Sequence, residues 1–375
     1  MKILVASDKF KGSLSAREAC EGIAAGLREG FRKTPIQIRI LPIADGGDGI
    51  AETLLAACGG EWIEVEVSGP LGDPLAAGYA LLDGGRVAVV EMAKASGLVL
   101  LAHRELNPQV ATTVGTGQLI AHATSIGVEE IVLGIGGSAT NDGGTGMAEA
   151  LGFRFEDAEG NPISGLPSGL ERVRKIRPPD KIIFPRVTVA CDVTNPLLGV
   201  EGCTPCYGPQ KGILPETFAF HEERLTHLVA LLGEAGQAAA TTPGAGAAGG
   251  LGFGAMVFLG ARLVPGFDLV AEKLGLSDAV READLVITGE GRLDAQSLQG
   301  KGPHGLVRLA RRHGKKTAVF CGSLESRSLE EEFGPVCEIR DPSLSLPQNL
   351  ANGAVHLREA AARFARSFDF RPANN

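Results

Sequence analysis

The sequence predicts an α/β protein with two domains. Short runs of β-branched residues alternate with stretches of helical pattern, which is typical of a largely parallel sheet. This alternation of strand and helix patterns occurs at both ends of the chain, and a different pattern lies between them. The length of 375 residues is ample for two hydrophobic cores. We therefore expect a discontinuous domain over residues 1–60 and 284–375, with a mixed α/β domain inserted over 61–283.

The discontinuous domain is expected to hold five strands. They are Lys2–Ala6, Ile36–Pro42, Leu285–Thr288, Thr317–Cys321 and Val336–Arg340. Helices are expected over about Ser15–Arg32, Ile50–Cys58 and Gly305–His313. Ser13 or Ser15 is expected to cap the first, since Ser15 with Glu18 has the form of a capping box. Five such strands suffice for a flavodoxin-like (Rossmann-like) sheet of order 2-1-3-4-5.

The inserted domain begins with antiparallel signals. Trp62–Val67, Tyr79–Leu82 and Arg86–Met92 alternate or run apolar, and Asp83-Gly84-Gly85 predicts a hairpin between the last two. Ile131–Gly136 and Val187–Asp192 are expected to be buried strands that end in polar loops. The domain should therefore contain a mixed sheet.

Charge and composition exclude several classes of function. With 36 basic and 44 acidic residues the net charge is −8, a poor match to nucleic acid or an anionic membrane. The first residues do not have the pattern expected of a signal peptide, and we expect no membrane span, since the most apolar stretch, Ala247–Ala261, is too short for a bilayer. Cys203 and Cys206 lack the partners of a zinc site and are expected to be reduced thiols in a loop. We expect a cytoplasmic protein, monomer or homodimer.

Two polar loops follow the first two strands, where open α/β sheets bind ligands. Asp8–Ser13 combines a carboxylate, two ammonium groups and a helix N-terminus, which suits an anionic substrate, although a plain turn has the same composition. Ala44–Gly49 places Asp45 and Asp48 around two glycines, so that one carboxylate can reach a metal or a hydroxyl proton; a structural turn is an equally good interpretation.

The third loop, Gly134–Gly146, is the most informative. Its glycines, among them Gly136, Gly137, Gly143 and Gly144, expose N–H groups that can cradle phosphate oxygens. The loop also carries four side chains able to bind Mg²⁺ or hydroxyls: Ser138, Thr140, Asn141 and Asp142. The pattern Gly134-x-Gly136-x-x-Ala139 is a weak dinucleotide fingerprint, and the chain contains no P-loop motif.

Three further segments have polar or glycine-rich patterns. Gly244–Gly254, which includes Gly249 and Gly250, permits either close approach to a nucleotide or close helix packing. Ala190–Pro196 carries Asp192, and Thr288–Asp294 carries Glu290, Arg292 and Asp294; each is expected to be a loop with carboxylates at the end of a strand. In a 2-1-3-4-5 sheet the Arg292 loop should lie beside the Lys11 loop.

Seven ordered motifs together resemble the type-1 glycerate kinase family of bacteria. They are Asp8-x-Phe10-Lys11-Gly12-Ser13, Ala44–Gly47, Gly134–Gly144, Ala190–Pro196, Gly208-Pro209-Gln210-Lys211-Gly212, Gly244–Gly250 and Thr288–Asp294. The resemblance covers about residues 1–325. It implies an ATP-dependent, Mg²⁺-assisted phosphorylation of D-glycerate, with 2-phosphoglycerate as the main product of this branch and the active site in a cleft between two α/β domains.

The expected roles follow from this chemistry, which needs positioning and charge stabilisation. Asp192 or Asp45 would be the catalytic base, and the two are not separated. Arg292 would bind the carboxylate of glycerate, with Lys11, Ser13 and Asp294 as further substrate contacts. Asp142 and Glu290 would bind Mg²⁺. The expected ATP contacts are Gly136, Gly137, Ser138, Asn141, Gly143, Gly144, Gly249 and Gly250.

Two rival interpretations are open. One is a nicotinamide-dependent oxidoreductase that uses the Gly134 loop, and the other is a non-catalytic protein that binds a small anion. Consumption of ATP that depends on glycerate would distinguish them.

Overall fold

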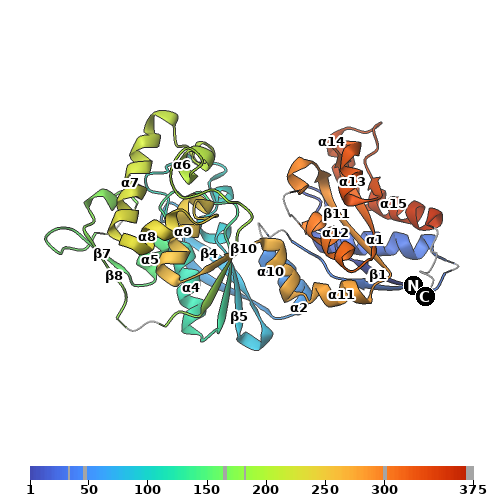
Figure 1. The fold of residues 1–375 in the computed structure, drawn as a ribbon, viewed down its shortest axis with the longest axis horizontal. Coiled ribbons are helices and arrows are strands. Elements are labelled where there is room, and N and C mark those ends of the chain that lie inside the picture. Colours follow the sequence, from blue (N-terminus) through green and yellow to red (C-terminus); the bar gives the residue numbers. More distant parts are fainter. Residues whose placement is uncertain (33, 45–48, 164–166, 181–182, 299–301, 369–375) are drawn as a thin grey trace. The chain divides into compact units, whose positions relative to one another are not determined.

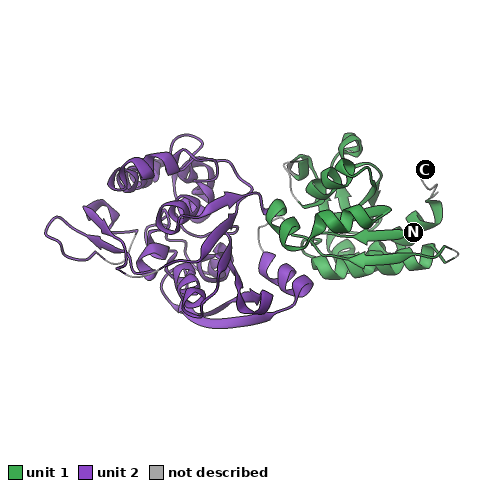
Figure 2. Ribbon diagram, turned by 60° about the horizontal axis from the view of Figure 1, so that its bottom comes forward, with its two compact units in different colours: residues 1–45, 267–375 green, residues 46–266 purple. Residues whose placement is uncertain are grey.

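The computed structural model describes residues 1–32, 34–44, 49–163, 167–180, 183–298 and 302–368 (Figure 1). The chain forms two compact units, which Figure 2 shows in green and purple. Unit 1 comprises residues 1–45 and 267–375, and unit 2 comprises residues 46–266. Residues 46–60 thus belong to unit 2 and residues 267–283 to unit 1. The sequence analysis assigned residues 46–60 to the discontinuous domain and residues 267–283 to the inserted domain. Helix α2 (Ile50–Cys58) explains the first difference, because it packs on strands of unit 2.

Unit 1 is built on a parallel sheet of five strands in the order β2-β1-β11-β12-β13. Their bounds are Lys2–Val5 (β1), Gln37–Ile40 (β2), Leu285–Leu293 (β11), Lys316–Leu324 (β12) and Val336–Glu338 (β13). This is the 2-1-3-4-5 order that the sequence predicts. One element differs, since β11 continues to Leu293 beside β12. The segment from Glu290 to Arg292, expected in a loop, is therefore strand.

Alternate residues of these strands fill two cores, as the pleat requires. Ile287 and Phe320 belong to the core on the side of helices α1 (Ala16–Gly30) and α15 (Gly353–Ser367). Val319 and Cys321 belong to a smaller core with Val307 of helix α12 (Gly302–Arg312). The remaining helices of unit 1 are α10 (Gly266–Lys273), α11 (Leu276–Glu282), α13 (Glu330–Phe333) and α14 (Leu346–Ala351).

Helix α1 begins as predicted. Ser15 is its N-cap, and the reciprocal bonds of a capping box join Ser15 and Glu18. Its glycines allow α15 to pack very closely: a Cβ added at Gly26 would lie 2.1 Å from the Arg358 carbonyl oxygen. The expected start of α1 is confirmed. The contact of α1 with α15 joins segments that are far apart in the sequence, and no local sequence signal predicts it.

Unit 2 contains a mixed six-stranded sheet of order β10-β9-β6-β5-β4-β3. The bounds are Glu61–Ser68 (β3), Pro74–Leu82 (β4), Val87–Glu91 (β5), Glu130–Gly134 (β6), Arg186–Ala190 (β9) and Arg262–Val264 (β10). Strands β3, β4 and β5 pair antiparallel, with the predicted hairpin between β4 and β5, and the other pairs are parallel. A separate ladder joins β7 (Arg154–Glu156) to β8 (Lys175–Arg177).

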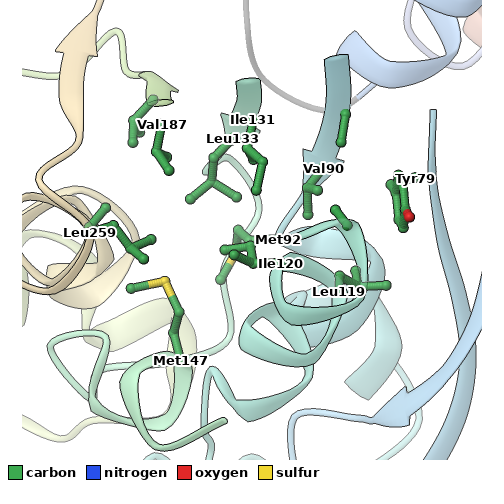
Figure 3. Close-up of a cluster of buried hydrophobic side chains, with 14 of the residues drawn as sticks. Tyr79, Val90, Met92, Leu119, Ile120, Ile131, Leu133, Met147, Val187 and Leu259 are labelled. Atoms are coloured by element: carbon green, nitrogen blue, oxygen red, sulfur yellow. The ribbon is translucent and has the colours of Figure 1, made fainter. Parts of the chain in front are cut away.

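The core of unit 2 joins this sheet to helices that include α4 and α5 (Figure 3). Ile131, Leu133 and Val187 of the sheet pack with Leu119 of α4 and Met147 of α5. The helices of the unit besides α2 are α3 (Ala93–Ser96), α4 (Val114–Ser125), α5 (Thr145–Ala150), α6 (Cys203–Tyr207), α7 (Phe218–Leu231), α8 (Gly233–Ala240) and α9 (Ala247–Leu259). In the described part of the chain no helix has the length and apolarity to cross a membrane.

Candidate active site

A cavity of about 300 Å³ in unit 2 lies at the carboxyl ends of β6 and β9. Its lining combines backbone of the Gly134 loop with polar and apolar side chains. The lining residues are Leu98, Ile135, Gly136, Gly137, Ser138, Ala190, Cys191, Asp192, Val193, Tyr207, Gln210, Lys211, Ala247 and Ala248. Three of the seven motifs of the resemblance thus contribute a polar group to one cavity.

The segment 136–138 forms the part of the Gly134 loop that faces the cavity. Gly137 has a φ of +71°, a conformation that favours glycine. Its carbonyl accepts a hydrogen bond from the Leu98 N–H at 2.8 Å, and the Ala139 N–H donates to the Ser96 carbonyl at 3.0 Å. These bonds hold the segment against residues 96–98. Of the eight predicted ATP contacts, Gly136, Gly137 and Ser138 line this cavity.

Asp192 lies two residues beyond the end of β9 and lines the same cavity. One carboxylate oxygen, Oδ1, accepts a hydrogen bond from the Gly266 N–H at 2.8 Å. This bond ties the loop after β9 to the residues after β10. A carboxylate placed in this way can accept a proton from a hydroxyl group bound in the cavity.

Lys211 supplies a cation that the sequence offered only as an alternative to Arg292 for the carboxylate of glycerate, together with Lys9 and Lys11. It lines the cavity although the residue is only 2% exposed, and its Nζ donates to the Thr140 carbonyl at 2.7 Å. Burial lowers the pKa of Lys211 to about 8, while the charges of Cys203 and Asp142 oppose that shift. The motif Gly208–Gly212 was the sequence signal for this residue.

Asp142, a predicted Mg²⁺ ligand, is fully buried and is not part of the cavity lining. Its Oδ2 accepts hydrogen bonds from the N–H and Oγ1 of Thr113 and from the Gly146 N–H, and its Oδ1 accepts from the Gly144 N–H. Burial raises the pKa of Asp142, and these hydrogen bonds oppose the rise. The carboxylate therefore organises the loop from inside, because protein donors occupy both oxygens.

Four of the predicted ATP-binding glycines pack against protein instead of lining the cavity. A Cβ added at Gly249 would lie 1.9 Å from the Thr140 carbonyl oxygen, and one at Gly250 would lie 2.8 Å from Leu197 Cδ1. An added Cβ at Gly143 would meet Leu228 at 2.8 Å, and one at Gly144 would meet Gly254 at 2.9 Å. Of the two interpretations of segment 244–254, the structure supports close packing.

Two other features of the Gly134 loop concern buried polar atoms. Asn141, another predicted ATP contact, is buried and donates from Nδ2 to Thr204 Oγ1 at 3.2 Å. Its Oδ1 and the Oγ1 of Thr140 are buried with no hydrogen-bond partner among the described residues. Ala248, in the cavity wall, has a φ of +55°, which is strained for a residue with a Cβ. Unpaired atoms and strain of this kind cluster at functional sites.

In unit 1 the loop after β1 lies against β11, as the predicted topology requires. A Cβ added at Gly291 would lie 2.9 Å from the Lys11 N. Lys11 and Ser13 line a smaller cavity of about 120 Å³, together with Arg340 and His356, which the sequence analysis did not select. Ser13 Oγ donates to the Leu350 carbonyl at 2.6 Å.

Arg292 does not line that cavity. Its side chain is 63% exposed and pairs with Glu325 at 3.1 Å and with Asp294 at 3.4 Å. Asp294 also accepts a hydrogen bond from the Ser297 N–H at 3.3 Å, which holds the turn after β11. Glu290 lies within β11, in register with Cys321. The predicted neighbourhood of Lys11 and β11 is correct, but the Arg292 guanidinium is engaged with carboxylates of its own unit.

Asp45 lies outside the described residues, together with 46–48. The helix that follows, α2, has a partner that the sequence analysis did not select: Glu91, at the end of β5, accepts hydrogen bonds from the N–H groups of Gly49 and Ala51. Glu91 is 3% exposed, and its burial raises its pKa. A buried carboxylate thus fixes the N-terminus of this helix.

Metal-binding groups and thiols were also expected from the sequence. Among the described residues, no three Asp, Glu, His or Cys side chains are grouped so that they could hold a metal ion. Cys203 and Cys206 are unbonded to one another and lie in α6, whereas the sequence predicted a loop. Burial raises the pKa of Cys203 to about 12, so this thiol stays protonated.

Comparison with known proteins now identifies the family. A sequence model described as the glycerate kinase family matches residues 3–369. The chain belongs to the glycerate kinase family. It is 41% identical to the glycerate kinase of Halalkalibacterium halodurans over 374 residues, 97% of each chain. It is 42% identical to the glycerate 2-kinase of Escherichia coli K12 over 332 residues, 86% of each chain.

The fold agrees with this assignment. A crystal structure of a protein assigned as glycerate kinase 2 from Salmonella typhimurium LT2 matches with a TM-score of 0.86 and 40% identity, over 97% of both chains. The resemblance of the seven motifs and the predicted enzyme class, glycerate kinase, are therefore confirmed. The α/β class with parallel sheets is confirmed as well.

Proposed function

We propose that this glycerate kinase transfers the γ-phosphoryl group of ATP to D-glycerate and releases 2-phospho-D-glycerate and ADP. One observation carries the proposal: the glycine segment 136–138, Asp192 and Lys211 line one cavity of unit 2. Backbone N–H groups and a cation suit phosphate oxygens, and a carboxylate suits the attacking hydroxyl. These are the parts that phosphoryl transfer needs.

In the proposed reaction Asp192 is the base. The C2 hydroxyl oxygen of glycerate forms the new bond to the γ-phosphorus, the bond from that phosphorus to the ADP oxygen breaks, and the hydroxyl proton passes to Asp192. The hydrogen bond from the Gly266 N–H orients the carboxylate of Asp192 for this task. Asp45 stays the alternative base.

The donor set suits Mg²⁺ that is bound mainly through ATP. Mg²⁺ in kinases usually takes one or two protein carboxylates together with phosphate oxygens, not a complete protein cage. The lack of a group of three acidic, His or Cys side chains among the described residues agrees with this arrangement. When bound, Mg²⁺ neutralises charge on the phosphates. Of the two predicted ligands, Glu290 stays a candidate, whereas the buried, fully hydrogen-bonded Asp142 does not fit.

For unit 1 we propose that Lys11 and Ser13 contact glycerate. The 120 Å³ cavity that they line is too small for a nucleotide. Arg340 and His356 add positive or polarisable groups to its wall. Arg292 and Asp294 keep their predicted role as substrate contacts, and the exposed guanidinium of Arg292 would exchange its carboxylate partners for the substrate.

The rival nicotinamide interpretation has less support. A dinucleotide fingerprint needs a helix that opens within the glycine motif, so that the pyrophosphate lies at its N-terminus. Here β6 ends at Gly134 and α5 begins at Thr145, with the Asp142-anchored loop between them. The Gly134 loop is thus poorly suited to that cofactor.

The test is direct. The purified protein is incubated with ATP, Mg²⁺ and each enantiomer of glycerate, and phosphorus NMR identifies the position of the phosphoester. We expect 2-phosphoglycerate from the D enantiomer only. A 3-phosphate product would contradict the proposed position of phosphorylation. ATP hydrolysis at a rate that does not depend on glycerate would contradict the proposed substrate.

A further inference from the structure

We propose that Lys211 is a catalytic residue whose ammonium group binds the transferred phosphoryl group and stabilises its charge in the transition state. This inference rests on the proposed function, because it takes the unit 2 cavity as the place of phosphoryl transfer. Lys211 keeps its protons throughout the reaction. A fixed cation aimed at developing charge in a site that excludes water is among the largest contributions to catalysis.

The backbone around Lys211 is held in place. Lys211 ends a short 3-10 helix, Pro209–Lys211, and its N–H donates to the Gly208 carbonyl at 2.9 Å. Gly212 follows with a φ of +88°, and a Cβ there would lie 2.9 Å from Leu106. A Cβ at Gly208 would lie 2.3 Å from the carbonyl oxygen of Thr204 in α6. Packing therefore fixes the backbone that carries Lys211, and the buried side chain ends in the bond to the Thr140 carbonyl.

The hydrogen bonds of the ammonium group leave room for a ligand. A protonated lysine has three N–H donors. In the described part of the chain one of them reaches a protein acceptor, the Thr140 carbonyl at 2.7 Å. Lys211 also lines the cavity, and in our proposal its remaining donors bind an anion there. Buried donors without acceptors are costly, and a bound phosphoryl group would satisfy them.

The charge of Lys211 points to the same ligand. The nearby carboxylate, Asp142, attracts Lys211 electrostatically, but its oxygens accept from Thr113, Gly144 and Gly146 instead. The ion pairs among the described residues do not include Lys211. A buried cation without a contacting anion is unfavourable. An anionic phosphoryl group in the cavity removes that penalty, so binding of the ligand is favoured.

Burial shifts the pKa of the thiol and phenol groups around the cavity in the opposite direction from that of Lys211. Cys203 faces Lys211 from α6, and Cys191 and Tyr207 line the cavity; burial raises the pKa of each, that of Cys203 to about 12. The carboxylates of Asp142 and Asp192 are the remaining charged neighbours. Lys211, whose pKa burial lowers to about 8, is thus the group expected to titrate just above neutral pH.

The first experiment compares Lys211→Met, Lys211→Arg and the control Lys175→Met, which removes an exposed lysine of β8 in the same unit. We expect kcat to fall about 10²–10³-fold in Lys211→Met. Lys211→Arg, which keeps the charge, should recover at least about tenfold of that loss. In the wild type, kcat/KM for ATP should fall as the pH rises through about 8. This fall should move to higher pH in Lys211→Arg.

The second experiment does not depend on catalysis or on a foldable variant. Binding of a non-hydrolysable ATP analogue with Mg²⁺ to the wild type is measured calorimetrically at pH 8 in two buffers of different ionisation enthalpy. An anion that binds the ammonium form draws a proton onto Lys211, so we expect uptake of about half a proton. Lys175→Met should show the same uptake, and Lys211→Arg should show none.

Two results would overturn the proposal. One is a folded Lys211→Met variant that keeps kcat within about threefold of the wild type. A lysine that only donates a hydrogen bond to the Thr140 carbonyl would affect the stability of the protein and leave kcat unchanged. The other is analogue binding without proton uptake at pH 8. Failure of the proposed function looks different: a wild type that takes up the proton on binding but phosphorylates no glycerate would contradict the substrate and support Lys211.

Discussion

The polar residues at the carboxyl edges of the two sheets differ in how they are held. In unit 2, Asp142 and Lys211 are buried and bonded to backbone groups of the Gly134 loop. In unit 1, Lys11 is exposed, and Arg292 pairs with two carboxylates that are themselves partly exposed.

The difference is instructive because burial and function place different demands on a charge. Buried groups held by several hydrogen bonds keep one position to a fraction of an ångström, which suits chemistry at a reacting phosphorus. Exposed pairs exchange partners at little energetic cost, which suits a substrate that must enter and leave. We therefore expect variants in unit 2 to change kcat or stability, and variants in unit 1 to change the KM of glycerate.

The largest expected effect is on the proposed base. Asp192→Asn should lower kcat by about 10²–10⁴-fold, because the amide cannot accept the proton. The fold should persist, since the amide oxygen of the introduced asparagine can still accept from the Gly266 N–H. Steady-state kinetics and circular dichroism provide the measurements, and Asp73→Asn, at an exposed aspartate paired with Arg104, is the control. Nearly full kcat in the variant would shift the role to Asp45.

Asp142→Asn should lower the free energy of unfolding by about 3 kcal/mol, because an amide nitrogen would face N–H donors in a fully buried site. Urea unfolding measures this value, again with Asp73→Asn as the control. A loss of less than about 1 kcal/mol would show that the loop does not depend on this carboxylate, and the contrast between the two units would weaken.

The glycine segment of the cavity gives a sharper comparison. Gly137→Val should raise the KM for ATP roughly tenfold or more by blocking close approach of phosphate. Gly127→Val is a matched control: its φ of +86° brings the same backbone strain, but a side chain there meets nothing within 4 Å. Both variants should lose stability. An equal ATP KM in the two would show that the segment does not contact the nucleotide.

The smallest effect is expected in unit 1. Arg292→Ala should raise the KM for glycerate by about threefold to tenfold and leave the KM for ATP nearly unchanged, since its exposed contacts contribute little. Arg39→Ala, at another exposed and paired arginine, is the control. If both KM values rise together or neither moves, Arg292 only pairs with its neighbours, and Lys11 or Arg340 becomes the candidate for the carboxylate of glycerate.

Most elements could be predicted from the sequence because their signals are local. Helix α2 has the predicted bounds, the capping box of α1 is present, and the strand order of unit 1 follows from five apolar runs and the rules of α/β connections. The extension of β11 to Leu293 was missed. Gly289 and Gly291 lower the strand propensity of that segment, and only pairing with β12 offsets this loss.

The candidate site shows where local signals end. The sequence by itself determined that a glycine-rich loop follows the buried strand β6 and that Asp192 follows the next buried strand in the sheet. Only the tertiary structure decided which of the loop's polar groups face the cavity. Lys211 reaches Thr140 across 71 positions of sequence, and Gly249 presses against the same residue from α9. The orientation of Asp142 likewise depends on Thr113, 29 positions away. Glycine content and residue type indicate that a loop can bind phosphate. The burial of each polar group, however, depends on neighbours that are distant along the chain. Burial in turn decides whether that group binds a ligand or supports the loop.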